Sequence, residues 1–164
     1  MNEILNKLSS YNIFNYLFPG IIFAVLANKV LKYPIALDRD RDLVIAAFFS
    51  YFAGLVVSRF GSLILEPLLR RLSLVTFADY RDFVLAAQKD KQLEVLSEVS
   101  NTYRTLCSLF ILLLLLKAYV KISSRFAYVR EWELTALLLL LLVMFLFSYR
   151  KQTSYITKRI RANL

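Results

Sequence analysis

Two leucine-rich runs constrain this chain more than any other feature. They are ILLLLL, from Ile111 to Leu116, and LLLLLLVMFLF, from Leu137 to Phe147. Hydrophobic residues make up 59% of the 164 residues, whereas soluble domains are nearer half apolar. Because the apolar excess is gathered into blocks and little chain remains for a soluble domain, we predict an all-α, multi-span membrane protein.

The first apolar stretch contains YNIFNYLFPG, residues 11–20, in which a Pro-Gly pair interrupts the pattern. The apolar residues after that pair are too few to cross a bilayer, which takes about 20 residues. The span therefore includes Pro19 and covers residues 13–31. Proline removes the N–H that would bond the carbonyl of Asn15, and in lipid that carbonyl needs another partner. We predict a kinked inner helix whose polar edge, with Asn12 and Asn15, faces protein or water.

Three further spans are predicted, at residues 43–65, 105–120 and 133–148. The last two are dominated by leucine, so we expect them to face lipid and the first two spans to lie inside. A short interfacial helix is predicted for residues 1–10, and a basic tail for residues 149–164.

Small residues recur at every fourth position of the second span: Ala46, Ser50, Gly54, Ser58 and Ser62. Such a row lets helix backbones approach closely, so plain helix packing is the simpler explanation. The functional alternative is that the row lines a narrow passage. Arg59 and Glu66 lie seven residues apart on one face of this helix. Arg59 either reaches toward the headgroups or, with Glu66, belongs to a buried, paired charge at a gate.

The largest piece outside the predicted spans covers residues 77–104. It has apolar residues at helical spacing and no Pro or Gly, so we predict one helix from Ala78 to Val120, roughly 65 Å long. Several such helices would form a cytosolic collar in a homo-oligomer. The alternative is a helix broken near Asp90 and packed back on its own chain.

Charge distribution predicts the orientation in the membrane. Thirteen of the 21 Lys and Arg residues fall in the N-terminal segment, in the stretch from Arg59, near the end of the second span, to Arg104, and in the tail. Positive residues favour the cytosolic side, so both termini and the 77–104 segment are predicted to be cytosolic.

The same cations point to partners. The predicted ligand-binding residues are Arg70, Arg71, Arg150, Lys151, Lys158, Arg159 and Arg161. Anionic lipid of the bilayer is the simpler partner. The alternative is a phosphate-rich ligand, a nucleotide or single-stranded nucleic acid, with Tyr149 and Tyr155 stacking on bases. In the first outer loop, DRDRD at residues 38–42 is either a solvated loop or, around an oligomer axis, a charged vestibule.

Catalytic chemistry has little support in the composition. The chain has no histidine, three glycines and one cysteine, Cys107, which lies in an apolar run. No His-based metal site, catalytic triad, phosphate loop or internal disulfide is available to one chain with this composition. We therefore predict a protein that is not an enzyme and that uses no metal or cofactor.

The layout of four spans, a basic cytosolic side and almost no soluble domain resembles the small membrane effectors of bacterial anti-phage systems. It is most similar to the membrane effector of the Hailong system, with the four-span Kiwa membrane subunit as a rival. The Hailong resemblance implies a homotetrameric ion channel in the bacterial inner membrane, held shut by single-stranded DNA oligomers that a partner nucleotidyltransferase makes. Small multidrug transporters also have four spans, but they carry an acidic residue in the first one, and this chain does not.

Three functions are therefore compared. The first is a gated oligomeric pore, favoured as a tetramer. Its pore-lining or gate residues are predicted to be Asn12, Asn15, Pro19, Gly20, Ser50, Gly54, Ser58 and Arg59. The second is a non-conducting membrane scaffold that docks a cytosolic partner through residues 77–104. The third is a holin-type lysis protein, which would form very large, disordered assemblies.

Overall fold

The computed structural model describes residues 12–31, 43–125 and 132–162, and within these ranges it contains helices and no strand. The elements, in order, are η1 (Ile13–Leu17), α2 (Phe18–Leu31), α3 (Leu43–Phe60), η2 (Gly61–Leu65), α4 (Glu66–Arg71), α5 (Tyr80–Lys89), α6 (Gln92–Ser123) and α8 (Glu133–Ala162). The turns η1 and η2 are π-helical, and each continues without interruption into the helix that follows.

Four helices are long and apolar enough to cross a membrane, as predicted from the sequence. They are Ile13–Leu31, Val44–Arg71, Gln92–Ser123 and Glu133–Ala162. The chain is therefore a multi-span, all-helical protein over the residues described. The predicted interfacial helix at residues 1–10 and the acidic loop at residues 38–42 lie outside the described residues.

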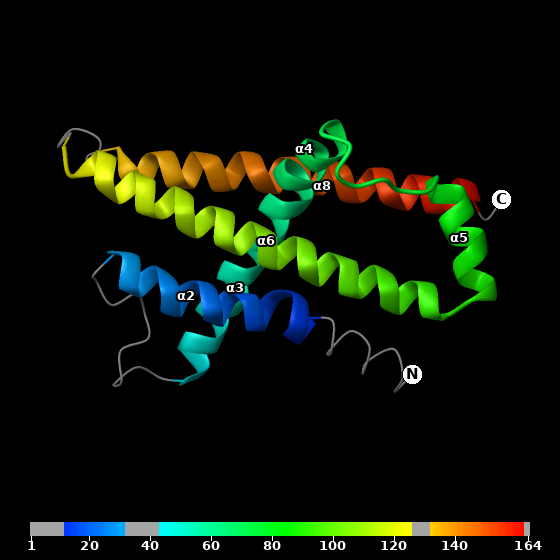
Figure 1. Cartoon of the computed structure of the whole chain (residues 1–164), viewed down its shortest axis with the longest axis horizontal. Helices are drawn as coiled ribbons and strands as arrows, with labels where there is room; N and C mark the ends of the chain where they lie inside the picture. Colours follow the sequence, from blue (N-terminus) through cyan, green and yellow to red (C-terminus); the bar gives the residue numbers. More distant parts are fainter. Residues whose placement is uncertain (1–11, 32–42, 126–131, 163–164) are drawn as a thin grey trace.

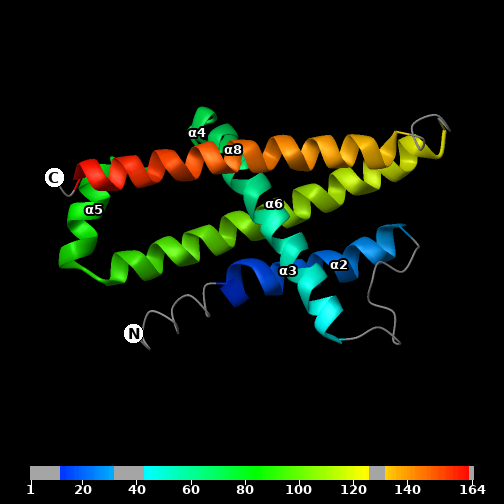
Figure 2. The same ribbon diagram turned by 180° about the vertical axis from the view of Figure 1, so that it is seen from behind.

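Three of the spans run alongside one another, and the second crosses them (Figure 1). Helices α2, α6 and α8 lie along the long axis of the molecule, while α3, with η2 and α4, runs obliquely across all three (Figures 1 and 2). Helix α5 leads into the start of α6 and packs against the end of α8. Helix α5 and the end of α8 therefore share one end of the molecule, whereas η1 lies nearer its middle (Figure 1).

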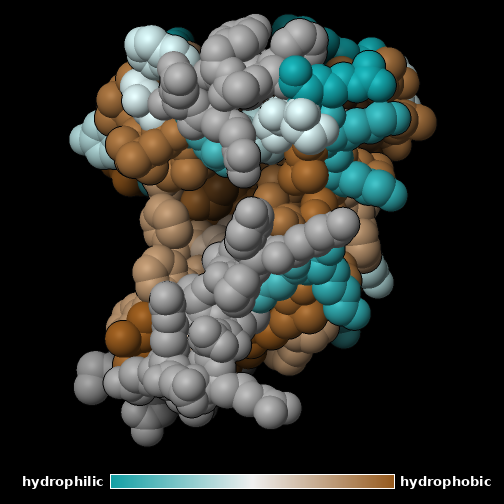
Figure 3. Space-filling view, turned by 90° about the vertical axis from the view of Figure 1, so that its left-hand side faces the viewer, coloured by the Kyte–Doolittle hydropathy of each residue, from teal (hydrophilic) through white to brown (hydrophobic). Residues whose placement is uncertain are grey.

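Burial separates the polar spans from the leucine-rich ones. In their apolar stretches, 28% of the residues are buried in each of the first two spans, against 17% in the third and 11% in the fourth. Helix α8 exposes a long series of apolar side chains, from Leu134 to Phe147, and apolar groups also cover much of the face shown in Figure 3. Such a surface suits lipid or a neighbouring chain. The first two spans are the more buried pair within one chain. Their inner position in an assembly stays a prediction.

The prediction of one unbroken helix from Ala78 to Val120 is wrong, because the helix is interrupted at Asp90. Asp90 has extended backbone angles, φ −128° and ψ 104°, and its carboxylate accepts a hydrogen bond from the backbone N–H of Gln92 at 2.9 Å. Aspartate competes in this way for the free N–H groups at a helix start, so Asp90 ends α5 and caps α6. Asp79 caps α5 in the same manner. The alternative prediction, a helix broken near Asp90 and packed back on its own chain, is therefore the correct one, and α5 packs on α8.

Candidate anion-binding site

The helix is widened just before each of the two prolines in the first two spans. The π turns η1 and η2 end two residues ahead of Pro19 and Pro67. After each turn a backbone N–H bonds to the carbonyl five residues back, as Glu66 does to Gly61. A proline lacks an N–H and its ring crowds the carbonyl four residues back, so the wider turn relieves the conflict within the helix.

Both π turns bring polar side chains to the interior. From η1, Asn15 and Tyr16 are buried, and from η2 comes buried Ser62 with Glu66 directly after it. Widened turns are frequent at functional sites because they re-aim side chains that a regular helix would direct elsewhere. The polar groups of the first and second spans are thus gathered where the two helices meet α6 and α8.

Helix α2 crosses α3 through backbone contact at two glycines. A Cβ on Gly20 would collide with the backbone carbonyl of Ser50, and a Cβ on Gly54 would collide with the backbone carbonyl of Tyr16. The buried members of the small-residue row are Ser50, Gly54, Ser58 and Ser62. Within one chain the row therefore serves close helix packing.

A buried cluster of hydroxyl and amide groups joins the first three spans. The hydroxyl oxygen of Thr105 lies 2.9 Å from Asn15 Oδ1, 3.4 Å from Ser58 Oγ and 2.9 Å from the backbone carbonyl oxygen of Asn101. Asn15 and Thr105 are 1% and 0% exposed. Thr105 has one proton to give, and Asn15 Nδ2 has no partner. A half-turn of the Asn15 amide would let Nδ2 donate to the Thr105 oxygen while Thr105 donates to Asn101.

Arg59 and Glu66 share a helix face but take different partners. The half-buried Arg59 donates a hydrogen bond of 3.4 Å to the Tyr16 hydroxyl on η1. Glu66 is 9% exposed and lies between two cations from other helices. Of the two residues, Glu66 is therefore the buried charge with ionic partners, and Arg59 is not its partner.

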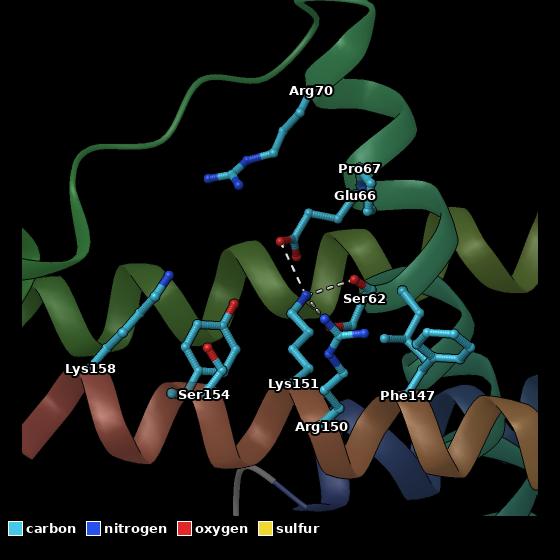
Figure 4. A pocket seen from close by; sticks show the side chains of 11 residues that line it. Ser62, Glu66, Pro67, Arg70, Phe147, Arg150, Lys151, Ser154 and Lys158 are labelled. Atoms are coloured by element: carbon cyan, nitrogen blue, oxygen red, sulfur yellow. Dashed lines mark hydrogen bonds and ion pairs between the residues drawn. The ribbon is translucent and has the colours of Figure 1, made fainter.

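The cluster around Glu66 links three helices. Arg104 Nη1, on α6, lies 2.6 Å from Glu66 Oε2, and Lys151 Nζ, on α8, lies 3.4 Å from Glu66 Oε1. Lys151 also donates to the carbonyl of Ser62 at 2.7 Å and to its hydroxyl at 2.8 Å (Figure 4). The short Arg104 contact is a strong, charge-assisted hydrogen bond, and the Lys151 contact with Glu66 is the weaker of the two.

Lys151 and Glu66 also belong to the wall of an open pocket of about 410 Å³. Its lining residues come from η2, α4 and α8: Ser62, Leu63, Glu66, Pro67, Arg70, Phe147, Arg150, Lys151, Ser154, Tyr155 and Lys158. Figure 4 shows Arg70 reaching in from α4, facing Lys151 and Lys158 on α8. Four cations and one carboxylate therefore surround a single space, which is the arrangement of an anion-binding site.

Aromatic contacts hold the side chains around this pocket. The Arg70 guanidinium carbon lies 4.4 Å from the centre of the Phe77 ring, and Lys151 Nζ lies 5.7 Å from the centre of the Tyr155 ring. Tyr155 itself packs on Tyr80 of α5, with ring centres 5.8 Å apart. Helix α5 and the segment before it thus support the pocket from outside.

The pocket lies where two helices change from apolar to charged sequence. On α8 the leucine-rich run ends at Phe147 and the cations begin at Arg150. On the second span the apolar residues end at Leu65, and Glu66 follows. In a bilayer such a transition marks the boundary between the hydrocarbon core and the aqueous side.

The structure gathers part of the predicted ligand-binding set. Arg70, Arg150, Lys151 and Lys158 line the pocket, and Arg71, Arg159 and Arg161 do not. Of the two tyrosines proposed to stack on bases, Tyr155 is in the lining and Tyr149 is outside it.

The predicted pore or gate residues lie near the crossing of the first two spans. Those that are buried within the chain are Asn15, Pro19, Gly20, Ser50, Gly54 and Ser58. Asn12 and Arg59 are half-buried. Whether any of them faces water in an assembly stays a prediction.

Sequence reasoning missed the two residues that connect these sites, Arg104 and Thr105. Both lie where the charged start of α6 gives way to its apolar run. The sequence did offer one signal for this contact: Arg104 is a cation at the start of the third apolar run, and Glu66 is the one acid of the second span.

No family model, curated protein or solved structure matches the chain. The resemblance to anti-phage membrane effectors therefore stays a prediction.

Proposed function

We propose that this chain is an oligomeric membrane effector that forms a gated ion channel in the bacterial inner membrane. A phosphate-rich ligand, a nucleotide or single-stranded nucleic acid, would control it, and anti-phage defence is the role that the resemblance implies. The observation that carries the proposal is the pocket, in which four of the predicted cations converge where η2 and α4 meet α8 in a multi-span bundle.

A route from the pocket to the span interior supports control by a ligand. Lys151 lines the pocket and contacts Glu66, and Glu66 is bound to Arg104. The next residue, Thr105, contacts Asn15 in the first span. A change in charge at the pocket therefore acts on side chains that join all four spans.

Conduction requires a rearrangement or further chains. Asn15 and Ser58 are buried between helices of one chain, where they face protein. An open state would part α2 from α3, with the Pro19 region supplying the bend, or would place polar faces of several chains around an axis. The exposed apolar side chains of α8 are available for such contacts between chains.

The deciding experiment measures ion flux from liposomes that hold the purified protein, with and without short single-stranded DNA. Flux that the oligonucleotide changes supports a ligand-gated channel. Absence of flux under both conditions, from protein shown to be folded and inserted, overturns the channel proposal.

A non-conducting scaffold is the second candidate, and one observation favours it. The first half of α6 exposes Leu96 (61%), Val99 (42%) and Tyr103 (64%), which recur at helical spacing. Such a stripe is typical of a surface that docks another protein. A scaffold would show no flux, and substitutions in the stripe would release its partner without changing the stability of the bundle.

A further inference from the structure

We propose that the pocket binds a single phosphate group and that this phosphate replaces Glu66 as the counter-ion of Lys151. The inference rests on the proposed function in one respect, because it takes the pocket to be the ligand site. It adds the chemical group that is bound and the contact that binding breaks.

The charge balance of the pocket favours an anion. Glu66 is the one acid among the lining residues in the described part of the chain, and Arg104, outside the lining, already neutralises it. The four lining cations, Arg70, Arg150, Lys151 and Lys158, are therefore left without an equal number of negative charges. A phosphate, with up to two charges and several acceptor oxygens, suits such a group.

The contacts of Lys151 show where the phosphate would bind. An ammonium group has three N–H donors, and two of them are directed to Ser62 at 2.7 and 2.8 Å. The third is directed to Glu66 at 3.4 Å, which is longer than an ordinary charged hydrogen bond. A phosphate oxygen can take this third donor while Ser62 keeps Lys151 in place.

Breaking the Lys151 contact leaves no unpaired charge behind. Glu66 keeps its 2.6 Å contact with Arg104, so its buried carboxylate stays neutralised. Removing both partners of a buried carboxylate would be costly, whereas exchanging the weaker partner is not. The exchange therefore provides a direct link from ligand binding to the contact between α8 and the second span.

The remaining walls indicate a phosphate that carries an organic group. The hydroxyls of Ser62 and Ser154 add donors, and Leu63, Phe147 and Tyr155 provide apolar and aromatic surface. A nucleotide phosphate with its base on Tyr155 fits these walls, and so does a lipid headgroup with its chains along Phe147. Both sources share the phosphate chemistry, and the experiment separates them.

The experiment uses the full chain in micelles of a maltoside detergent, which contain no phosphate, and measures binding of a fluorescent, 5′-phosphorylated oligothymidylate by anisotropy. A parallel arm measures the thermal stability of the protein in the same micelles with and without phosphatidylglycerol. Oligonucleotide binding identifies a soluble phosphate. Stabilisation by phosphatidylglycerol without oligonucleotide binding identifies a lipid headgroup.

A pair of charge-matched variants tests the pocket itself. Arg70→Gln with Lys158→Gln removes two lining cations, and Arg71→Gln with Arg161→Gln removes two cations outside the lining. We expect the first pair to weaken binding, or abolish lipid stabilisation, by about tenfold or more, because it removes charged hydrogen bonds. The second pair should lose only the weaker, longer-range attraction. Equal losses in both pairs, or no response to either phosphate source, overturn the inference.

The exchange at Lys151 has its own variants. Glu66→Gln removes the competing carboxylate and should tighten phosphate binding severalfold, whereas Glu98→Gln, with the same change in net charge, should not. If Glu66→Gln fails to fold, Ser62→Ala serves instead and should weaken binding, because it removes the hydroxyl that holds Lys151. Unchanged affinity in both Glu66→Gln and Ser62→Ala contradicts the exchange.

These outcomes are separable from those of the proposed function. Phosphate binding that depends on the pocket pair, in a protein that conducts no ions, upholds the inference and overturns the channel. Flux that responds to single-stranded DNA equally in both variant pairs upholds the channel and overturns the pocket as its ligand site.

Discussion

The crossing of α2 with α3 and the contact of α8 with the second span are built in opposite ways. At the crossing, Gly20 and Gly54 place backbone against backbone, with no side chain between. At the α8 contact, Lys151 reaches across to Glu66 and Ser62 beside an open pocket. A backbone contact has one geometry, whereas a lysine can exchange partners by rotating its bonds. The first contact is therefore suited to hold the bundle, and the second is suited to change with a ligand.

The largest effect is expected where the crossing is broken. Gly54→Ala would push a methyl group into the Tyr16 carbonyl, and the two helices would have to separate. We expect the free energy of unfolding to fall by about 3 kcal/mol, near the upper end for overpacking. The midpoint of unfolding in a detergent titration measures it.

Gly61→Ala is the matched control for that substitution on the same span. Its Cβ would meet the Ser108 hydroxyl, which is a side-chain atom that can rotate away. The loss of stability should therefore be clearly smaller than for Gly54→Ala. Similar losses for the two variants would contradict the distinction between a rigid and an adjustable contact.

The next largest effect is expected at the ion pair between Arg104 and Glu66. Arg104→Gln removes the close partner of Glu66, whose side chain is 11% exposed. Leaving a buried carboxylate with only its weaker partner should cost about 3 kcal/mol or somewhat less. Glu66 would then depend on Lys151, so phosphate affinity should fall, opposite to the effect of Glu66→Gln.

Arg125→Gln is the control for this variant, because Arg125 is exposed just beyond the other end of α6. It removes the same charge and should change neither stability nor phosphate binding appreciably. Detergent titration and anisotropy measure the two quantities. An Arg104→Gln protein as stable as Arg125→Gln would show that the ion pair does not hold α6 to the second span.

A smaller effect on stability, but a decisive one for function, is expected at Asn15. Asn15→Leu removes an amide whose nitrogen has no partner, and Thr105 keeps its hydrogen bond to the Asn101 carbonyl. Stability should therefore change by less than about 1 kcal/mol or rise. If the chain is a channel, ion flux should change. Unaltered flux in a conducting protein would remove Asn15 from the pathway, and Thr105→Val controls for loss of the hydrogen bond alone.

The fold was largely predictable because bilayer thickness sets the length of an apolar helix. The four spans follow from the apolar runs, and the greater burial of the first two within the chain follows from Asn15 and the small-residue row. The break at Asp90 was only the alternative prediction, because the absence of Pro and Gly was given more weight than an aspartate that can cap a helix.

The site was predictable only in its charge. The basic tail indicated an anion, but the partner of Glu66 is 38 residues away on α6, and helix packing alone brings the two together. The same packing decides that Arg70 enters the pocket and Arg71 does not. Adjacent residues on a helix point in different directions, and a sequence without its tertiary contacts does not say which direction faces a neighbour.

The last predicted effect lies in the turn that follows α4, next to the pocket. Ser73 ends α4 with φ 56°, and the bonds from Leu74 N to Leu69 O and from Ser73 N to Arg70 O, both 3.0 Å, close the helix end around it. This left-handed position favours glycine, so Ser73→Gly should raise the free energy of unfolding by about 1 kcal/mol. Ser100→Gly, in the middle of α6, should instead lower it by about half as much. Detergent titration of the two variants tests whether the sign reverses, and destabilisation by Ser73→Gly would show that the turn beside Arg70 is not held in this conformation.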